Sequence, residues 1–214
     1  MAYLDRITGT RTSDRAVEVM MECLKMPGAN PQSPSRLGST ARRILDTARE
    51  QVAGLIGSDP REITFVSNGT ESVNLAIRGL LQSASRSRKG RKIIVSSVEH
   101  VSVLNTVKSL EKQGFEGVVI PVDATGRLDF PAFRQALDDD VLLVSIQLAN
   151  PEIGTIQDVR AVSDAAHARD ISVHCDAVDA VGWMPVDVND LNVDALSFSG
   201  TQFHGPPGGA ALFV

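Results

Sequence analysis

The sequence predicts a single three-layer αβα domain on a mixed, mostly parallel sheet of about seven strands. Short apolar runs alternate with amphipathic helical segments after residue 62, the pattern of crossover units. The runs 93–95 and 141–144 are apolar on both faces, as central strands of a covered sheet are. Residues 200–209 are too few and too rich in Gly and Pro for a helical crossover, so the last strand should run antiparallel.

Residues 1–62 should form a helical segment that precedes the sheet core of residues 63–214. One helix should begin at Ser13-Asp14 and end near Met26, because Ser and Asp cap helices and Pro-Gly follows. After a loop over 29–35, apolar residues from Leu37 to Leu55 recur at helical spacing. The expected strands are 63–67, 92–97, 117–122, 141–148, 172–177, 194–199 and 210–214, with helices near 71–82, 100–113, 129–138 and 158–169. The basic run 86–92 should be a solvated loop.

Composition narrows the functional classes. The chain is 43% apolar and 22% charged, as in soluble globular proteins, and its net charge of -5 argues against a nucleic-acid partner. No apolar stretch is long enough to span a membrane, and the N-terminus does not resemble a signal peptide. The cysteines, Cys23 and Cys175, are far apart and lie in apolar surroundings, so neither a disulfide nor a metal site is expected. We expect a cytoplasmic protein.

Ligands of open α/β sheets bind at the carboxyl ends of the strands, so the residues there are the candidates. Gly69-Thr70 follows the first strand at a helix start, where backbone N–H groups, a hydroxyl and the helix dipole suit a phosphate. The alternative is an ordinary capped helix with Thr70 as the cap. His100 follows the second strand and could stack on an aromatic ligand, move a proton or be structural.

Two further candidates follow later strands. Asp176 ends an apolar run, where a buried carboxylate needs a cationic partner, either a protonated ligand nitrogen or a basic side chain of the protein. Ser199-Gly200 opens a glycine-rich turn, which allows close approach of the backbone to a ligand or is a structural turn into the last strand.

The order and spacing of these motifs resemble the class V aminotransferases, and among them the cysteine desulfurases. The resemblance covers essentially the whole chain. It is carried by residues 70–79, Glu99-His100, residues 150–158, Asp176 and Ser199-Gly200, with further likeness at Tyr3-Leu4-Asp5, Asn30-Pro31, Ser33, residues 126–129, Val193-Asp194 and Gly205-Pro206.

The resemblance implies a fold-type I enzyme that uses pyridoxal phosphate to release cysteine sulfur as an enzyme persulfide. A lysine of these enzymes holds the cofactor as a Schiff base and moves protons at the substrate. By position, Gly69, Thr70 and Ser199 would bind the phosphate, and His100 would stack on the ring. Asp176 would pair with the protonated ring nitrogen.

This sequence departs from the family on the reacting side of the cofactor. Gln202 stands at the position of the Schiff-base lysine, and Thr201 replaces a histidine that would help to bind the phosphate. Pro151 replaces an asparagine, and Asp179 a glutamine, that would contact the ring hydroxyl. A glutamine amide is neither nucleophile nor base, so the covalent anchor and the general base are both missing.

The family also has a small C-terminal domain and a loop with the persulfide cysteine. The sequence ends at Val214, so we expect that domain to be absent, and neither Cys23 nor Cys175 matches that cysteine. The leading hypothesis is a desulfurase-like pseudoenzyme, inactive alone. It would act as a homodimer, or as a heterodimer with a desulfurase-like chain, and could dock sulfur-transfer or iron–sulfur scaffold partners. The alternatives are a noncovalent module for pyridoxal phosphate or another phosphate ligand, and the N-terminal part of a desulfurase.

Overall fold

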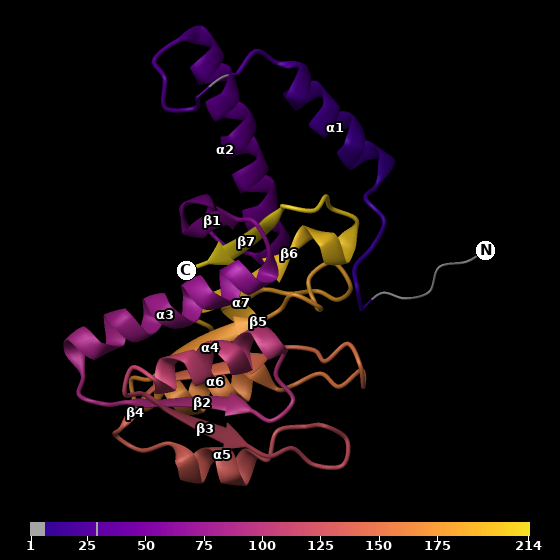
Figure 1. Cartoon of the computed structure of the whole chain (residues 1–214). Coiled ribbons are helices and arrows are strands. Elements are labelled where there is room, and N and C mark those ends of the chain that lie inside the picture. Colours follow the sequence, from indigo (N-terminus) through magenta and orange to yellow (C-terminus); the bar gives the residue numbers. More distant parts are fainter. Residues whose placement is uncertain (1–6, 29) are drawn as a thin grey trace.

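The computed structural model describes residues 7–28 and 30–214, so the likeness at Tyr3-Leu4-Asp5 lies outside the described residues. One seven-stranded sheet has the order β1-β7-β6-β5-β4-β2-β3. Its strands are β1 (Ile63–Val66), β2 (Lys92–Ser96), β3 (Glu116–Ile120), β4 (Val141–Gln147), β5 (Ser172–Asp176), β6 (Ala195–Ser199) and β7 (Ala210–Phe213). The predicted fold class is confirmed, because β7 alone runs antiparallel to its neighbours β1 and β6 (Figure 1).

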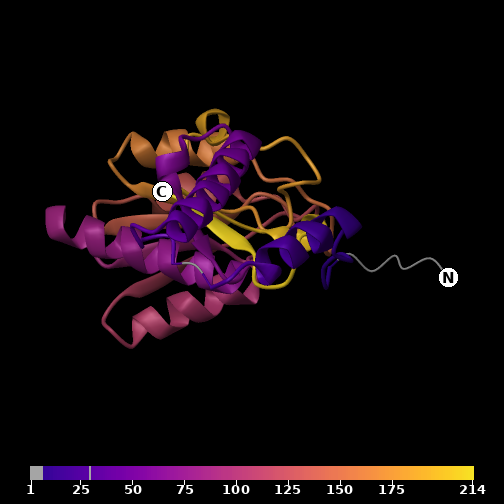
Figure 2. The same cartoon turned by 90° about the horizontal axis from the view of Figure 1, so that it is seen from above.

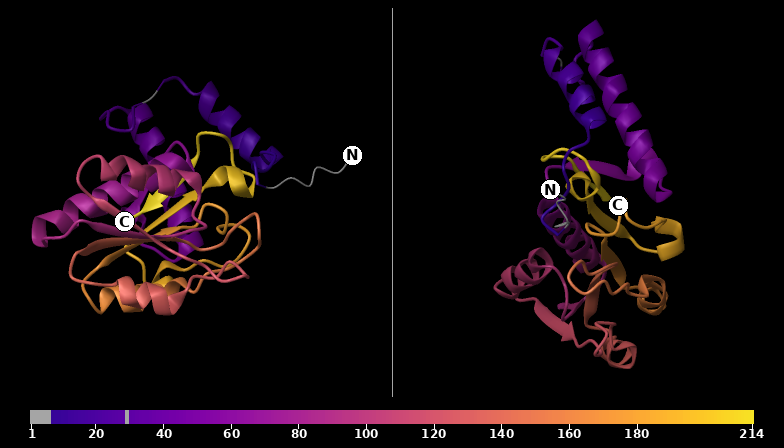
Figure 3. Two further views of the ribbon diagram at one scale, coloured as in Figure 1. Left: turned by 60° about the horizontal axis from the view of Figure 1, so that its bottom comes forward. Right: turned by 90° about the vertical axis from the view of Figure 1, so that its right-hand side faces the viewer.

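Helices cover both faces of the sheet. They are α1 (Asp14–Lys25), α2 (Arg36–Ile56), α3 (Gly69–Ser87), α4 (Val101–Glu111), α5 (Phe130–Ala136), α6 (Val159–His167) and α7 (Val188–Leu191), with short 3-10 turns at Pro60–Glu62 and Gly200–Phe203. Figure 3 (left) shows α3 and α4 on one side and α5 and α6 on the other. Neighbouring residues of β2 face these two layers in turn: Ile93 packs with Val73 and Val103, and Ile94 joins the cluster of Phe133 and Val162.

Helix α3 is longer than the sequence predicted. It runs to Ser87, and the N–H of Arg88 closes it by donating to the carbonyl of Ala84, so the first two residues of the basic run 86–92 are helical. The helix continues because Leu81 is buried and Leu80 and Ala84 pack on the core of the sheet, which outweighs the modest helix preference of the serines. Residues 88–91 form the predicted loop between a helix and a strand, and Lys92 begins β2.

The α1–α2 arm projects beyond the β1 edge of the sheet and lies nearest the viewer in Figure 2. Ser13 caps α1 as predicted, but α1 has no buried residue, and Leu24 is 74% exposed. In α2 the apolar face from Leu37 to Leu55 is largely exposed, whereas Ala53 and Ile56 are buried. The periodicity predicted these helices correctly, but within the described residues most of that face has no partner.

A row of buried polar side chains crosses the sheet under α3. The imidazole of His174 lies between the hydroxyls of Ser145 and Ser197, at 2.8 and 2.9 Å. Ser72 donates to Ser197 Oγ or to the carbonyl of Ala211, at 2.9 and 3.0 Å. Burial lowers the pKa of His174 to about 3, so the ring is neutral and its nitrogens are paired.

Candidate functional site

A cleft of about 720 Å³ opens where β2, β4 and β6 end at their carboxyl edge and α3 begins. Gly69, Thr70, His100, Ser199 and Gln202 all line it. Residues that follow three separate strands therefore meet at one place, as their positions after the strands predicted.

The start of α3 forms one wall of the cleft. Asn68 caps the helix, since its Oδ1 accepts the N–H of Glu71 at 2.8 Å, so the interpretation of Thr70 as the cap was wrong. Gly69 and Thr70 are the first helical residues and present the positive end of the helix dipole to the cleft. A Cβ on Gly69 would lie 2.7 Å from Val178 Cγ2, so only glycine fits there.

Ser199 and Thr201 supply hydroxyls to the same cleft. Their oxygens are 2.9 Å apart, where β6 gives way to the Gly200–Phe203 turn. Helix N–H groups on one side and two hydroxyls on the other form a donor set suited to a phosphate.

Asp176 ends β5, is only 6% exposed and is not among the residues that line the cleft, although Val178 and Asp179 just after it are. It accepts the N–H of Val178 at 3.1 Å, and burial raises its pKa to about 6. Within residues 7–28 and 30–214 no basic side chain forms an ion pair with this carboxylate. Among the described residues the alternative of a basic side-chain partner for Asp176 is therefore not seen.

His100 combines a structural and a ligand-facing position. Its Nδ1 accepts the N–H of Ser102 at 3.1 Å and thereby caps α4. Accepting that bond assigns the proton of the neutral ring to Nε2. The ring itself is exposed and lines the cleft, where it can cover a planar ligand.

Gln202 is held by an acid at the position where the family has its lysine. Its Nε2 donates to Asp179 Oδ1 at 2.6 Å, and its backbone carbonyl accepts the indole N–H of Trp183 at 2.8 Å. The other amide atom, Oε1, is buried and has no hydrogen-bond partner within the described chain. Burial raises the pKa of Asp179. Of the described residues that line the cleft, none is Lys or Arg.

The family model for class V aminotransferases matches residues 2–214. The chain belongs to this family. It is 43% identical over 215 residues to the cysteine desulfurases IscS of Salmonella arizonae and Escherichia coli, covering 99% of this chain and 53% of each relative. This class V aminotransferase chain thus spans about half the length of these curated relatives and is cysteine desulfurase-like.

Solved structures agree on the fold. A NifS-like protein superposes with a TM-score of 0.94 at 36% identity, covering 100% of this chain and 58% of that one. The structure of SspA in complex with cysteine superposes with a TM-score of 0.93 at 33% identity, covering 100% of this chain and 61% of that one. An apo cysteine desulfurase from Thermococcus onnurineus NA1 superposes with a TM-score of 0.88 at 29% identity, covering 99% of this chain and 53% of that one.

Pyridoxal phosphate, which membership of this family makes plausible, fits the cleft at two of its ends. The α3 start and the hydroxyls of Ser199 and Thr201 suit its phosphate, and the carboxylate of Asp176 suits a protonated pyridine nitrogen. Two further lining residues are Gln202, whose side chain is an amide rather than an amine, and Pro151, which has no backbone N–H.

Sequence reasoning did not single out two residues of this class V site, Glu99 as a buried acid and Gln147. Glu99 Oε1 accepts from Ser96 Oγ at 2.5 Å and from the N–H of Gln147 at 3.0 Å, whereas Oε2 is buried without a partner in the described part. Burial raises the pKa of Glu99 to about 8, so it is mostly protonated at neutral pH. Gln147 Nε2 donates to the carbonyl of Val98 at 2.6 Å and fixes the loop after β2. The sequence signal that could have identified Gln147 was its position as a polar residue at the end of the apolar run 141–146.

Neither cysteine belongs to the site. Cys175 is buried within β5, which raises its thiol pKa, and Cys23 is exposed on α1 rather than in apolar surroundings as the sequence suggested. Within the described residues, no cluster of His, Cys, Asp and Glu could hold a metal ion, and no helix is long and apolar enough to cross a membrane.

Proposed function

We propose that this chain is a cysteine desulfurase-like subunit that has no desulfurase activity on its own and that holds pyridoxal phosphate without a covalent bond. The observation that carries the proposal is the Gln202–Asp179 pair, at 2.6 Å, in a cleft where no described lining residue is a lysine. Position 202, where the family's lysine would provide an amine, carries a neutral amide instead. That amide already donates a hydrogen bond to Asp179.

The remaining residues support binding more than turnover. When bound, the cofactor supplies an electron sink for reactions at an amino acid. In this chain Asp176 would hold the ring nitrogen in its protonated form, Gly69 and Ser199 would bind the phosphate, and His100 would cover the ring. The glutamine at position 202 cannot accept or donate a proton as a general base or acid would. The rate factor that such a group contributes, about 10²–10⁴-fold, is therefore missing from this position.

Sulfide and alanine release from cysteine, measured with added pyridoxal phosphate, tests the inactivity. We expect no turnover above the protein-free reaction, and robust turnover would overturn the proposal. Titration with pyridoxal phosphate should saturate, and Asp176→Ala should weaken the binding. Borohydride should leave no lysine adduct in the cleft.

A gain-of-function variant makes the same test sharper. Gln202→Lys combined with Asp179→Gln restores the family's residues at the two paired positions, and we expect borohydride to trap a single adduct on the new lysine by mass spectrometry. Asp179→Gln alone is the matched control and should give none. An adduct of equal yield in wild type and in the double variant would contradict the assignment of position 202.

The exposed α1–α2 arm supports a role through an interface. The apolar side chains Val17, Met20, Met21 and Leu24 of α1 are all 40% exposed or more. Monomeric proteins seldom leave such a patch uncovered. We propose that the subunit pairs with a second copy or with an active desulfurase-like chain, in soluble cytoplasmic sulfur or iron–sulfur metabolism. Light scattering after size-exclusion chromatography, with a pull-down from the native host, tests this; a strict monomer without partners would count against it.

The chain length favours one alternative, the N-terminal part of a longer desulfurase. The curated relatives are about twice as long as the aligned chain, which covers 53% of them. Sequencing the native gene beyond the codon for Val214 decides this alternative, because a following small domain with a loop cysteine would support it.

A further inference from the structure

We propose that the cleft selects the amine form of the cofactor, pyridoxamine 5′-phosphate, over the aldehyde form, and that Asp179 is the residue that sets this preference. The inference rests on the noncovalent site proposed above and names the ligand class that the site would favour.

The charges around the cleft are unusual for the binding of an anionic aldehyde. The carboxylates of Glu152 and Asp179 line it, and a third lining acid, Glu99, is mostly protonated at neutral pH. The basic side chain among the described lining residues is His100, whose Nδ1 is occupied by the cap of α4. Away from the N-terminus of α3, a positively charged group of the ligand would therefore be attracted by these carboxylates, and a negatively charged group would be repelled.

Asp179 places one of these carboxylates directly beside the side chain of Gln202. Its Oδ1 lies 2.6 Å from Gln202 Nε2, so a ligand group that reaches position 202 also reaches the carboxylate. Position 202 is where the family's lysine would meet the carbonyl carbon of the cofactor. The ring substituent that distinguishes the amine from the aldehyde would thus lie beside Asp179.

Hydrogen-bonding capacity at this point favours the same ligand. An aldehyde oxygen and a ring phenolate are acceptors, but Asp179 is itself an acceptor and Pro151 has no N–H to donate. The donor amide of Gln202 is already bonded to Asp179 and to the carbonyl of Ile7, so it offers no further N–H to an aldehyde oxygen. An ammonium group brings three donors and a positive charge to the carboxylate of Asp179.

Three ligands separate the contribution of the ammonium group from that of the shared phosphate and ring. Calorimetric titration of the whole chain with pyridoxamine 5′-phosphate, pyridoxal 5′-phosphate and 4-deoxypyridoxine 5′-phosphate gives three dissociation constants. The deoxy compound carries a methyl group in place of the amine or aldehyde and cannot modify surface lysines. Quenching of Trp183, the one tryptophan, which contacts Gln202, gives a second readout.

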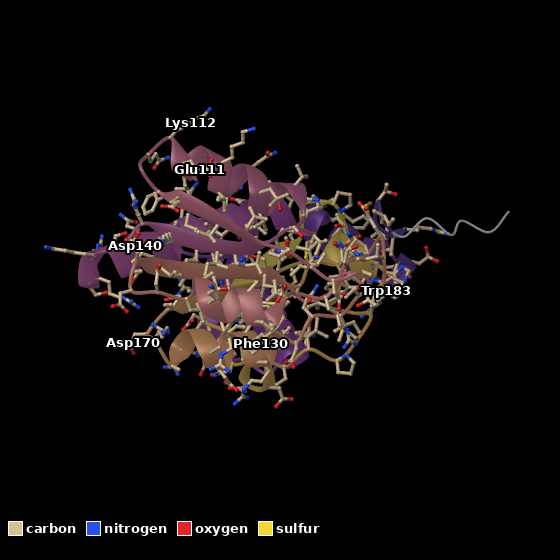
Figure 4. All side chains as sticks on the ribbon, turned by 90° about the horizontal axis from the view of Figure 1, so that it is seen from below. Glu111, Lys112, Phe130, Asp140, Asp170 and Trp183 are labelled. Atoms are coloured by element: carbon tan, nitrogen blue, oxygen red, sulfur yellow. The ribbon has the colours of Figure 1, made fainter. Side chains whose placement is uncertain are left out.

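We expect the amine to bind at least about tenfold more tightly than either other ligand. Asp179→Asn should reduce this preference to about twofold or less, and Asp179→Gln should act in the same way if the asparagine variant is unstable. Asp139→Asn is the matched control, because this side chain is fully exposed just before β4. Figure 4 shows its neighbour Asp140 at the end of the molecule opposite Trp183. The control should retain the full preference.

The outcomes separate this inference from the proposed function. Equal or tighter binding of the aldehyde or the methyl compound, or a preference unchanged in both Asp179 variants, would overturn the role of Asp179 and leave the noncovalent site standing. Failure of all three ligands to bind would overturn both.

Discussion

Replacement of Glu99 by glutamine should remove a pH-dependent destabilisation that the wild-type cleft carries. The carboxyl is 6% exposed, and its ionised form lacks a cationic partner within the described chain. Burial raises its pKa from 4.5 to about 8 in the folded state, despite hydrogen bonds from Ser96 and Gln147 that lower it. Glutamine keeps the acceptor that Ser96 and Gln147 use and cannot ionise.

The sign and size of the effect follow from proton binding. Between pH 4.5 and about 8 the folded protein keeps a proton on Glu99 that the unfolded chain has released. The free energy of unfolding therefore falls as pH rises, by at most about 1.4 kcal/mol per pH unit. At pH 8 the accumulated loss is about 4 kcal/mol relative to pH 4.5, which is comparable with the whole stability of a marginal domain.

Urea unfolding followed by Trp183 fluorescence at pH 6.5 and 7.5 measures this difference. Between these two values the wild type should lose about 1 kcal/mol more than Glu99→Gln does. The contribution of His174 is shared by both proteins and cancels in the comparison. If the two proteins showed parallel dependence on pH, the protonated state of Glu99 in the fold would be refuted.

Three further substitutions test the site and its support. Ser197→Ala leaves His174 Nε2 without its partner and should lower the free energy of unfolding by about 1–3 kcal/mol; unchanged urea stability would contradict the buried row. Gly69→Ala forces a Cβ against Val178 and should cost about 1–3 kcal/mol as well as affinity for pyridoxal phosphate, so an alanine variant that binds normally would argue against the close packing. Asn68→Ala removes the cap of α3 and should cost about 1 kcal/mol, with faster amide exchange confined to the first turn as the signature.

The parts of the fold that depend on local pattern were predictable. Apolar runs bounded by turn residues located the seven strands, and the short Gly/Pro link predicted the antiparallel β7. The carboxyl-end rule brought Thr70, His100 and Ser199 to one cleft.

What depends on contacts between distant residues was not predictable. Periodicity identifies the apolar face of α2 but not whether a partner covers it, and most of it is exposed. Asn68 and Thr70 are both good caps, so only the backbone shows which of them serves. The bond between Gln202 and Asp179 and the raised pKa of Glu99 arise from tertiary packing, which residue types alone do not reveal.

The pairing of β1 with β7 has a consequence for the order in which this protein assembles during synthesis. β1 is an edge strand whose neighbour in the sheet is β7, and Ile63 pairs with Phe213. A ribosome must therefore release about 150 further residues after β1 before that strand acquires its partner, a contact of high sequence separation and slow closure. The turn that leads into α3 and lines the cleft begins directly after β1, so the cleft is completed late, after the β2–β5 layer is available to fold.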